Sequence, residues 1–565
     1  MRSTIKIVIL LFFICTSMSG ASFPDMEKYM RQHALIWEQL PMQWNEGAFL
    51  GNGLVGMMVY ADSTLNALVF HLGRPDVTDH RKAPYRKTSI GTEEADKMVD
   101  FCRLDVGKML LFPEGKILSG TFYLDIYNAE LTGHLKTDKG DLTFHAYTPQ
   151  PEEVNIVEVS SGVPYRWKGI PGNPCSPRIR VFPHLKEKLK YKDNPAPVVD
   201  QKDKEGSWVQ SLLAGGDYAT YWKEVPGGKS RSVLYVSTAN EVPASSLSLA
   251  KAMKTVEATQ ITGTKLLKQK TRQWWNAYHE RSFLSIPDKK LENFYFIQMY
   301  KLATCSHPDG PAMDVMGTFF KLSPWPSFWW NLNIQLTYMP IGPANRMEQG
   351  KNFQRLMDEV FPSLVRSIEP CKIGDYTWAL QNYYMYLRYA GADWQDIKQQ
   401  VVPKALDAFA VFDKILCYKE NTWHLTHIES PEYEGFQKYN DSNYGLASLS
   451  WLLQTLIACH DRTSSTHPDY ARWKEILTRL VPYPTNENGL MIAANKPLEK
   501  SHRHYSHLLA FYPFRLLHPD VPENRKFLEK SIEHWLSLED GKGLAGYSYT
   551  GAASLYAYLG NGNKA

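Results

Sequence analysis

The sequence predicts a multidomain β + α protein, with an N-terminal β-sandwich followed by a helical toroid of the (α/α)6-barrel type. Two observations lead to this prediction. Before residue 265, short runs of alternating apolar and polar residues recur, which is the period of strands. After residue 265, apolar residues recur at the helical spacing instead. The length of 565 residues leaves room for more than one domain.

The predicted sandwich depends on strands that follow one another closely between turns. The tripeptides at 138–140 (Asp-Lys-Gly) and 226–228 (Pro-Gly-Gly) are typical of turns. Many strands at short intervals, with no helix between them, indicate a β-sandwich. The predicted strands are residues 121–126, 142–146, 155–159 and 232–236.

The predicted toroid depends on helices joined by loops, without a clear strand pattern. One such helix has on one side the residues Leu266, Leu267, Thr271, Trp274 and Trp275. No repeat of fixed period selects a TPR or ankyrin array, so a closed toroid with its loops gathered at one end is favoured over an open solenoid. The predicted helical segments are residues 266–275, 294–303, 377–389, 444–459 and 525–538.

The first residues are typical of a secretory signal peptide. Arg2 and Lys6 precede a short apolar run, and small residues offer a cleavage site after Ala21. No later stretch reaches about 18 apolar residues without charge, so we expect an exported protein, periplasmic or secreted, with no membrane span. The predicted divisions are residues 1–21 (signal peptide), 22–260 (β-sandwich), 261–290 (helical linker) and 291–565 (barrel).

Composition and charge exclude several classes of protein. Hydrophobic residues make up 44% and charged residues 22%, which excludes a disordered, collagen-like or coiled-coil chain. Lys and Arg (63) nearly balance Asp and Glu (59), so the charge does not indicate nucleic-acid binding. Of the seven cysteines, the six after the predicted cleavage site show no C-x-x-C spacing, so no zinc site is expected. Most should be buried thiols, although a pair or two could bridge.

Three polar and aromatic segments between helices are candidates for a site. In residues 325–335, Asn331 and Asn333 stand among tryptophans, and Asn can orient a water by donating one hydrogen bond and accepting another. The structural alternative is a helix start with Asn caps and core tryptophans. In residues 427–435, Glu432 is one of three clustered carboxylates. A general acid needs a carboxyl whose pKa is raised by burial or by a neighbouring like charge. The structural alternative for this segment is a solvated acidic loop.

The third segment, residues 502–509, contains three His and one Arg within six residues. Arg503 and His504 could bind sugar hydroxyls. The spacing of His504 and His507 could also suggest a metal site. However, no acidic ligand accompanies them and the H-E-x-x-H pattern is absent, so no metal is expected.

Taken in order, these segments resemble glycoside hydrolase family 95, the inverting α-L-fucosidases and α-L-galactosidases. Residues 44–57 (W-N-E-G-A-F-L-G-N-G-L-V-G-M) are similar to the family's opening W-x-E-A-x-P-x-G-N-G-x-L-G-A-M. Residues 331–335 (N-L-N-I-Q), 430–432 (S-P-E) and 502–508 (H-R-H-Y-S-H-L) are similar to its N-I-N-x-Q, S-P-E-N and H-R-H-x-S-H-L, and 546–548 more weakly to T-G-W-S. The family's fold is a β-sandwich, a helical linker and an (α/α)6 barrel.

The resemblance implies a role for each matching residue and no cofactor. It makes Glu432 the general acid, which protonates the glycosidic oxygen. It makes Asn331 and Asn333 the residues that hold the attacking water. Arg503 and His504 would bind substrate hydroxyls, and the aromatic pair Trp329 and Trp330 would also bind the substrate. Trp329 stands where the family usually has a sugar-binding His. A Trp there supplies a stacking face, so substrate choice could depart from L-fucose.

The sequence departs from the family at the catalytic base. In the family, an Asp from a later D-G-N segment activates the water through the two Asn. This sequence ends at Ala565 before any such segment, so we expect a divergent, C-terminally truncated member with an incomplete barrel. Asp441 is a fallback candidate for the base, although a helix cap is the more ordinary role for it.

The leading hypothesis is an exported inverting glycosidase that acts on a terminal α-linked L-fucose or related L-sugar of an oligosaccharide or polysaccharide. A polysaccharide lyase on a helical toroid is an alternative that would use Arg503, His504 and Tyr505. A glycoside phosphorylase is another, although no distinctive phosphate-binding loop occurs. A non-catalytic sugar-binding protein is the alternative that the missing base supports.

Overall fold

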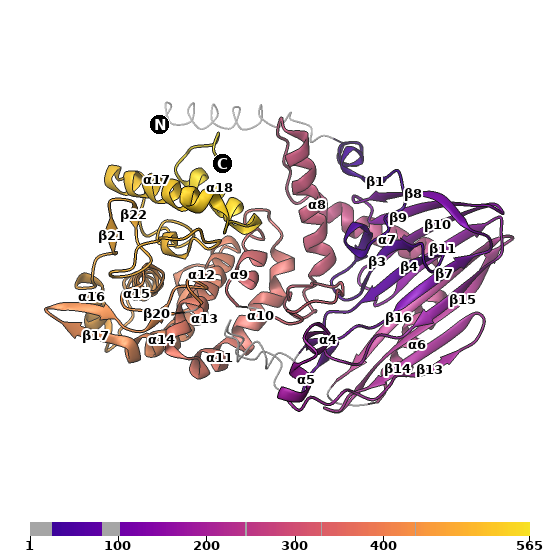
Figure 1. The fold of residues 1–565 in the computed structure, drawn as a ribbon, viewed down its shortest axis with the longest axis horizontal. Coiled ribbons are helices and arrows are strands. Elements are labelled where there is room, and N and C mark those ends of the chain that lie inside the picture. Colours follow the sequence, from indigo (N-terminus) through magenta and orange to yellow (C-terminus); the bar gives the residue numbers. More distant parts are fainter. Residues whose placement is uncertain (1–24, 82–101, 243–245, 329, 436) are drawn as a thin grey trace, which may run out of the picture.

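The computed structural model describes residues 25–81, 102–242, 246–328, 330–435 and 437–565. Strands gather on one side of the molecule and most helices on the other, with α8 (Lys289–Cys305) between the two parts (Figure 1). The predicted order of a sheet-rich part followed by a helical part is confirmed. The predicted signal peptide, residues 1–21, lies outside the described residues.

Two antiparallel sheets make up the N-terminal part. The nine-stranded sheet runs in the order β1 (Leu35–Trp37), β8 (Ile117–Asp125), β9 (Glu130–Thr137), β10 (Asp141–Tyr147), β11 (Asn155–Ser161), β16 (Arg231–Glu241), β15 (Asp217–Gly228), β14 (Glu205–Ser211) and β13 (Val198–Gln201). The five-stranded sheet runs in the order β12 (Tyr165–Ile170), β7 (Lys108–Pro113), β4 (Ala67–Gly73), β3 (Gly56–Asp62) and β2 (Ala48–Gly51).

The two sheets pack face to face around one apolar core. In β9, buried Leu131, Gly133 and Leu135 alternate with exposed residues, so one face of the strand turns inward. Across the interface, Phe70 of β4 contacts Phe144 of β10 with ring centroids 5.5 Å apart. The predicted β-sandwich is therefore present.

All four predicted strands exist, as parts of β8, β10, β11 and β16. The predicted turn at 138–140 joins β9 to β10. The predicted turn at 226–228 is displaced, because β15 continues to Gly228 through a register shift between Pro226 and Gly228. A glycine-rich bulge and a turn share the same residue types, so the sequence alone does not separate them.

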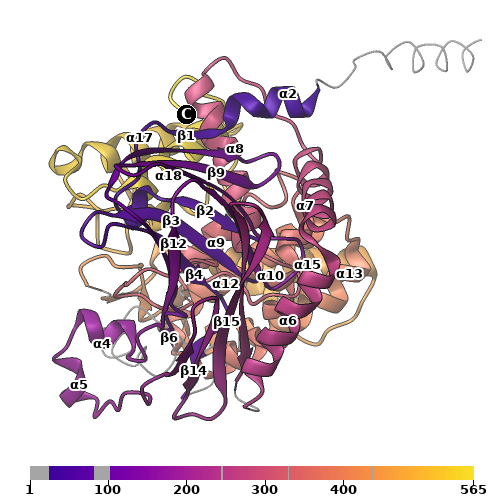
Figure 2. The same cartoon turned by 90° about the vertical axis from the view of Figure 1, so that its right-hand side faces the viewer.

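Two helices cover the sandwich before the helical part begins. Helix α6 (Ser248–Thr262) packs against β14, β15 and β16 on the face of the large sheet opposite the core, where Val256 meets Ile156 and Tyr235 (Figure 2). Helix α7 (Thr264–His279) and α8 add Trp275 and Tyr300 to the sandwich core itself. Residues 261–290, the predicted helical linker, therefore include α7, which packs on the sandwich.

The G-N-G sequence of the opening motif docks the sandwich onto the end of α8. Asn52 accepts hydrogen bonds from the amides of Leu54 and Val55 and donates to the carbonyls of Pro149 and Glu152. Gly53 has a φ of 82° and donates its amide to the carbonyl of Thr304 at 3.0 Å. A Cβ atom at Gly53 would lie 2.3 Å from the carbonyl carbon of Ser306, so this approach requires glycine.

The helical part packs around its own apolar core, which extends from Leu302 to Leu559. The five predicted helical segments coincide with helices, the last of which ends at Ser537. The helices of the helical part after α8 are α9 (Asn333–Tyr338), α10 (Lys351–Glu359), α11 (Phe361–Ser367), α12 (Ile373–Tyr389), α13 (Trp394–Gln400), α14 (Val402–Phe412), α15 (Asn443–Thr463), α16 (Tyr470–Thr478), α17 (Pro522–Ser537) and α18 (Gly546–Tyr558). Shorter helices precede them: α2 (Met26–Met30), α4 (Pro177–Val181) and α5 (Leu185–Lys188).

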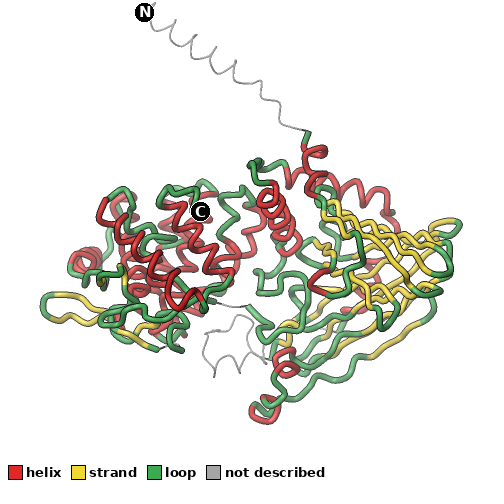
Figure 3. The backbone as a smooth tube through the Cα atoms, turned by 45° about the horizontal axis from the view of Figure 1, so that its top comes forward, coloured by secondary structure: helices red, strands yellow, loops and turns green. Residues whose placement is uncertain are grey.

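Short strands lie between the helices of this part, although the sequence shows no clear strand pattern there. Figure 3 shows short strands within the helical part. Each is two to four residues long, too short for an alternating pattern to be detected in the sequence. The pairs are β17 (Leu416–Lys419) with β18 (Thr422–Leu425), β19 (Ile428–Glu429) with β20 (Lys438–Tyr439), and β21 (Thr485–Asn486) with β22 (Gly489–Leu490); β5 (Thr78–Asp79) and β6 (Cys102–Arg103) form a fourth pair beside the sandwich.

The segment that leads to Asn331 is braced by two arginines of the sandwich part. The buried guanidinium of Arg103 donates to the carbonyl of Gly317 at 2.6 Å and pairs with Asp314 at 3.2 Å. Arg178 donates to the carbonyl of Pro324 at 2.7 Å, with its guanidinium 4.9 Å from the ring centre of Trp325. The sandwich therefore supports the loop that carries one side of the candidate site.

The six cysteines after residue 101 are free thiols, and Cys102, Cys371 and Cys459 are buried. The pairs that could have bridged do not do so in this structure. In the described ranges, no helix is both long and apolar enough to cross a membrane.

Candidate active site

Glu432 lies in the turn that follows β19, and two segments far apart in sequence meet there. Its carboxylate accepts hydrogen bonds from Arg503 Nε at 2.7 Å and from His504 Nε2 at 3.1 Å, with a further bond from Arg503 Nη2. The hydroxyls of Ser430 and Ser506 lie 3.0 Å apart and join the same two segments. The structure thus brings together three of the residues predicted for the site.

The surroundings of Glu432 favour its charged form. Burial by itself would raise the pKa of Glu432, but the hydrogen bonds and charges of His504 and Arg503 outweigh it and lower that pKa to about 2. The Arg503 side chain is 53% exposed, whereas that of His504 is 3% exposed. His504 and Arg503 therefore hold Glu432 as a carboxylate in this arrangement.

Asn331 forms a second cluster with two residues that the sequence analysis did not identify. Its Nδ2 donates to Asp375 Oδ1 at 2.8 Å and to the hydroxyl of Tyr444 at 2.9 Å. The Tyr444 hydroxyl donates in turn to Asp375 Oδ1 at 2.6 Å. Asp375 lies in the first turn of α12 and Tyr444 in the first turn of α15, so two helix starts meet at Asn331.

The Asp375 cluster holds an acidic group and a phenol with different proton affinities. Burial raises the pKa of Asp375, and the hydrogen bonds from Tyr444 and Asn331 offset only part of this effect. Burial and the neighbouring carboxylate raise the pKa of Tyr444 well above its ordinary value. Tyr444 therefore keeps its proton and donates it in the hydrogen bond to Asp375.

His504 connects the two clusters. Its charge acts on Asp375 as well as on Glu432, to which it is hydrogen-bonded. Tyr547, in the first turn of α18, packs against His504 with ring centroids 5.4 Å apart, and its pKa responds to the charge of Glu432. His504 therefore acts to lower the pKa of both carboxyl groups, Glu432 and Asp375.

A third carboxyl, Glu429, lies in β19 only three residues before Glu432. Burial raises the pKa of Glu429 to about 7, and the charge of Asp375 adds to this effect while Lys372 opposes it. The thiol of Cys371 lies 3.5 Å from Glu429 Oε1. Glu429 is therefore a buried group that changes its protonation state near neutral pH.

Among the described residues, no hydrogen bond joins the side chains of Asn333 and Trp330 to these clusters. Asn333 is exposed at the first position of α9. Trp330 is only 1% exposed and packs between Phe328 and Tyr376, so here it contributes to the core, as the structural alternative had it. Trp329 lies outside the described residues. The substrate-binding roles of both tryptophans stay predictions.

Asp441 has a structural role, but not the one expected. Its Oδ1 accepts from the amide of Leu425 at 2.8 Å, and its Oδ2 lies 2.8 Å from His424 Nδ1. The N-cap of α15 is the next residue, Ser442, whose hydroxyl accepts from the amide of Gly445 at 3.1 Å. The capping expectation for Asp441 is therefore wrong by one residue, because Asp441 turns toward β18 instead.

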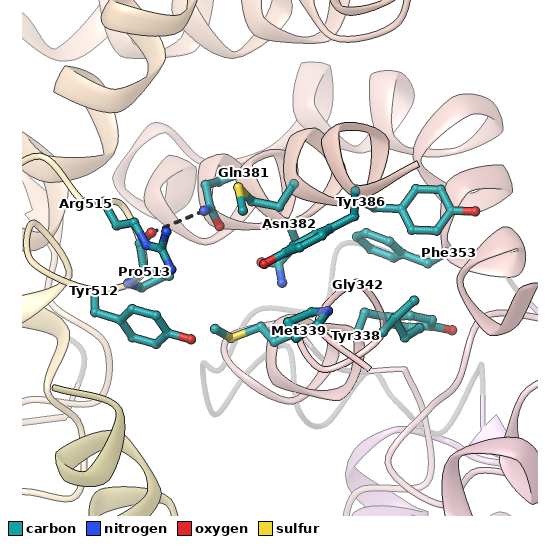
Figure 4. A pocket seen from close by; sticks show the side chains of 14 residues that line it. Tyr338, Met339, Gly342, Phe353, Gln381, Asn382, Tyr386, Tyr512, Pro513 and Arg515 are labelled. Carbon is teal, nitrogen blue, oxygen red and sulfur yellow. Dashed lines mark hydrogen bonds between the residues drawn. The ribbon is translucent and has the colours of Figure 1, made fainter. Parts of the chain in front are cut away.

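A separate pocket lies farther along α12, beyond the Asp375 cluster (Figure 4). Tyr338, Tyr386 and Tyr512 line it together with the amides of Gln381 and Asn382. Its volume of about 100 Å³ holds several waters, well below the several hundred Å³ that a pocket for a larger ligand needs. Gln381 donates to the carbonyl of Pro513 at 3.3 Å across it.

Within the described ranges, no group of three His, Cys, Asp or Glu could hold a metal ion.

The sequence offered one weak signal for the missed residues. Asp375 follows Lys372-Ile373-Gly374 at a helix start, where an acidic residue ordinarily complements the helix dipole. Tyr444 is one of 32 tyrosines and carries no distinguishing pattern. Only the packing of α12 against α15 shows that both reach Asn331.

Comparisons with known proteins agree with this architecture. A human-microbiome protein provisionally described as a kojibiose phosphorylase aligns over 91% of this chain and 80% of its own, with a TM-score of 0.59 and 9% identity, which shows a shared fold. A bacterial glucoamylase complexed with acarbose (8% identity, TM-score 0.45, 79% of this chain and 69% of its own) is also similar. So is a family GH92 alpha-mannosidase from Bacteroides thetaiotaomicron (10% identity, TM-score 0.39, 92% and 77%).

No curated protein matches the sequence. Residues 371–565, however, match the glycosyl hydrolase family 95 catalytic domain. The match includes Glu432, Arg503, His504 and Asp375, whereas Asn331 and Asn333 precede it. Residues 371–565 are thus similar to the catalytic domain of a glycoside hydrolase family, and the sandwich followed by a helical part agrees with this similarity.

Proposed function

We propose that this protein is an exported glycoside hydrolase that removes a terminal α-linked L-fucose or related L-sugar from an oligosaccharide with inversion of configuration. Glu432 is the general acid, and Asn331 holds the attacking water on the other face of the sugar. Arg503 and His504 bind substrate hydroxyls. Export follows cleavage of the signal peptide after Ala21, into the periplasm or the medium.

One observation carries this proposal: His504 acts on the carboxylate of Glu432 and on the Asn331–Asp375 cluster at the same time. An inverting glycosidase needs an acid on one side of the glycosidic bond and a water-activating group on the other, with carboxyl groups about 6.5–9.5 Å apart. Two polar clusters that share one histidine suit this arrangement. The family match over residues 371–565 supports the reaction class.

The proton on Glu432 has to arrive with the substrate. In the free protein, Arg503 pairs with Glu432 and favours the carboxylate. When a sugar hydroxyl takes over the exposed guanidinium, Glu432 loses one positive neighbour and its pKa rises toward the range of a proton donor. Substrate binding and acid activation are then one event.

The test is a hydrolysis panel. Oligosaccharides capped with α-L-fucose, α-L-galactose or α-L-rhamnose are offered to wild type and to Glu432→Gln, with and without phosphate, and released sugar is followed by NMR. We expect release of the inverted anomer without need for phosphate, reduced by about 10²–10⁴-fold in the variant. Glu434→Gln is the matched control, since Glu434 lies in the same turn but pairs with Lys496 at 3.0 Å.

A phosphate requirement would assign the protein to the phosphorylases instead. A retained anomer, or equal losses in Glu432→Gln and Glu434→Gln, would refute the assignment of Glu432 as the acid of an inverting enzyme.

A second candidate function is sugar binding without turnover. The observation that favours it is the tight pairing of Glu432 with Arg503 and His504, which leaves no protonated acid in the free protein. Saturable binding of the same oligosaccharides by calorimetry, with no sugar released by a folded protein, would establish this function and exclude the first.

A further inference from the structure

Asp375 is the acidic side chain in direct contact with the residue expected to hold the attacking water. Its Oδ1 accepts two hydrogen bonds, from Asn331 Nδ2 at 2.8 Å and from the hydroxyl of Tyr444 at 2.6 Å. The donors come from different parts of the chain, the segment before α9 and the start of α15. Neither hydrogen bond is made within α12, the helix on which Asp375 lies.

Helix capping does not explain Asp375. The N-cap position of α12 is Lys372, and it makes no side-chain capping bond. The carboxylate of Asp375 turns away from its own helix and toward side chains of neighbouring elements. Its backbone carbonyl is held as well, because Gln335 Nε2 donates to it at 2.9 Å.

The triangle of bonds fixes which way the Asn331 amide faces. Both partners of Nδ2 act as acceptors, since Asp375 is a carboxylate and the Tyr444 hydroxyl already donates to Asp375. A flipped amide would place its oxygen against these two acceptors. The Asn331 oxygen therefore points elsewhere; it is buried and has no hydrogen-bond partner within the described residues. An unpaired buried acceptor is costly, and a bound water that donates to it removes the cost.

Asp375 is more exposed than its two hydrogen-bond partners. Asn331 and Tyr444 are 2% and 1% exposed, whereas Asp375 is partly exposed. Its Oδ1 accepts both of these hydrogen bonds, and Oδ2 makes none to the part of the chain that the structure describes. A water between Oδ2 of Asp375 and the oxygen of Asn331 would have two acceptors for its two hydrogens, with one lone pair left for the sugar.

We propose that Asp375 is the catalytic base of this hydrolase, an inference that depends on the proposed function. The attacking water gives a proton to Asp375 Oδ2 as its oxygen bonds to the anomeric carbon. The glycosidic C–O bond breaks, and its electron pair takes the proton of Glu432. Asp375 then returns its proton to solvent while Glu432 is protonated again.

The test uses the full chain and the L-sugar-capped oligosaccharide that wild type hydrolyses. Asp375→Asn keeps the shape of the side chain, and we expect kcat to fall by about 10²–10⁴-fold with little change in KM. Asp375→Ala leaves space for a small nucleophile. Azide should then bond to the anomeric carbon while Glu432 protonates the leaving oxygen, giving a glycosyl azide of inverted configuration.

The matched control is Asp358→Asn. Asp358 likewise accepts from a tyrosine hydroxyl at 2.6 Å, that of Tyr383, but it lies on α10 away from Asn331. Its variant should keep activity within about threefold. Asp441→Asn tests the fallback base. Thermal unfolding midpoints of all variants show whether a loss of activity reflects a loss of folding.

Azide-dependent product from Asp375→Ala, together with the loss in Asp375→Asn, would support the inference. Activity of Asp375→Asn within about tenfold of wild type, an Asp375→Ala loss that azide does not relieve, or a larger loss in Asp441→Asn would overturn it. If wild type releases no sugar at all, the proposed function fails and this inference falls with it. The two failures can be distinguished, because a failure of the proposed function is seen in wild type, whereas a failure of this inference is seen only in the variants.

Discussion

At the residue scale, Glu429 and Glu432 show how far surroundings separate two identical side chains. They lie three residues apart, yet the pKa of Glu429 is raised to about 7 and that of Glu432 is lowered to about 2. Burial acts on both. The difference is that Glu432 has Arg503 and His504 as partners, whereas the nearby charge of Asp375 adds to the effect of burial on Glu429. Residue type and spacing in the sequence do not contain this distinction.

Glu429→Gln should remove a pH dependence of stability. Because the folded-state pKa of Glu429 lies above its unfolded value, its contribution to the free energy of unfolding is present below about pH 4.5 and is lost as pH rises through about 7. The loss amounts to about 3 kcal/mol. Urea unfolding at pH 5 and pH 8 should therefore differ less in the variant. If the free energies of unfolding at the two pH values differ equally in wild type and variant, the prediction is wrong. Glu434→Gln is the control and should keep the wild-type difference, because the pKa of Glu434 is lowered.

Arg503→Gln should shift the pH profile of hydrolysis. Without the guanidinium, the pKa of Glu432 rises from about 2, and a charged partner of this kind contributes about 1–3 pH units. An acid acts in its protonated form, so the basic limb of the kcat/KM profile should move to higher pH. Lys496→Gln removes a cation from Glu434 instead and should leave the limb in place. An unmoved limb in Arg503→Gln would mean that Glu432 does not set it.

At the element scale, the β2–β3 turn and the helix starts position the site. The turn at Gly53 fits against the end of α8, and α8 precedes the segment that leads to Asn331. The first turns of α12, α15 and α18 supply Asp375, Tyr444 and Tyr547. Helical periodicity predicted α12 and α15, because both present long buried faces. It did not predict which of their first-turn residues would meet.

Gly53→Ala should destabilise the junction between the sandwich and α8. The added Cβ would lie 2.3 Å from the carbonyl carbon of Ser306, and a positive φ costs a non-glycine residue about 1–2 kcal/mol. Gly263→Ala is the control, since Gly263 has a φ of 79° but no atom within 4 Å of its Cβ position. We expect the free energy of unfolding to fall by at least about 2 kcal/mol more at Gly53 than at Gly263. Equal losses would mean that the turn is not tightly docked.

At the scale of the whole molecule, the sandwich supports the helical part through the segment before Asn331. Arg103 and Arg178 reach across from the sandwich to hold Asp314, Gly317 and Pro324. The Arg103 guanidinium is buried, so its partners depend on it for their hydrogen bonds.

Arg103→Met should weaken this support. It removes the donor to Oδ2 of Asp314 and to the carbonyl of Gly317, at a cost of about 3–5 kcal/mol for a broken buried pair. Limited proteolysis should then cut within residues 306–328 faster than in wild type. Arg166→Met, which removes an exposed arginine stacked on Phe112, should leave the rate unchanged. A cut elsewhere, or none, would show that other contacts hold the two parts together.

The sequence by itself determined the fold class and half of the site. Strand and helix periods are local, so alternation at 121–126 and the helical spacing at 444–459 were sufficient to predict β8 and α15. The S-P-E and H-R-H motifs were sufficient to single out Glu432, Arg503 and His504 as site residues, but their hydrogen bonds, which span 71 and 72 residues, were not predicted.

Only the tertiary structure decided the rest. Asp375, Asn331 and Tyr444 are separated by 44 and 69 residues, and nothing local marks them as partners. Their meeting depends on how α12 and α15 pack against each other and against the segment before α9. The same packing sets the burial and the neighbouring charges that raise the pKa of Glu429 and lower that of Glu432. Proton affinities and long-range contacts arise from the assembled core, whereas secondary structure arises from the local pattern of the chain.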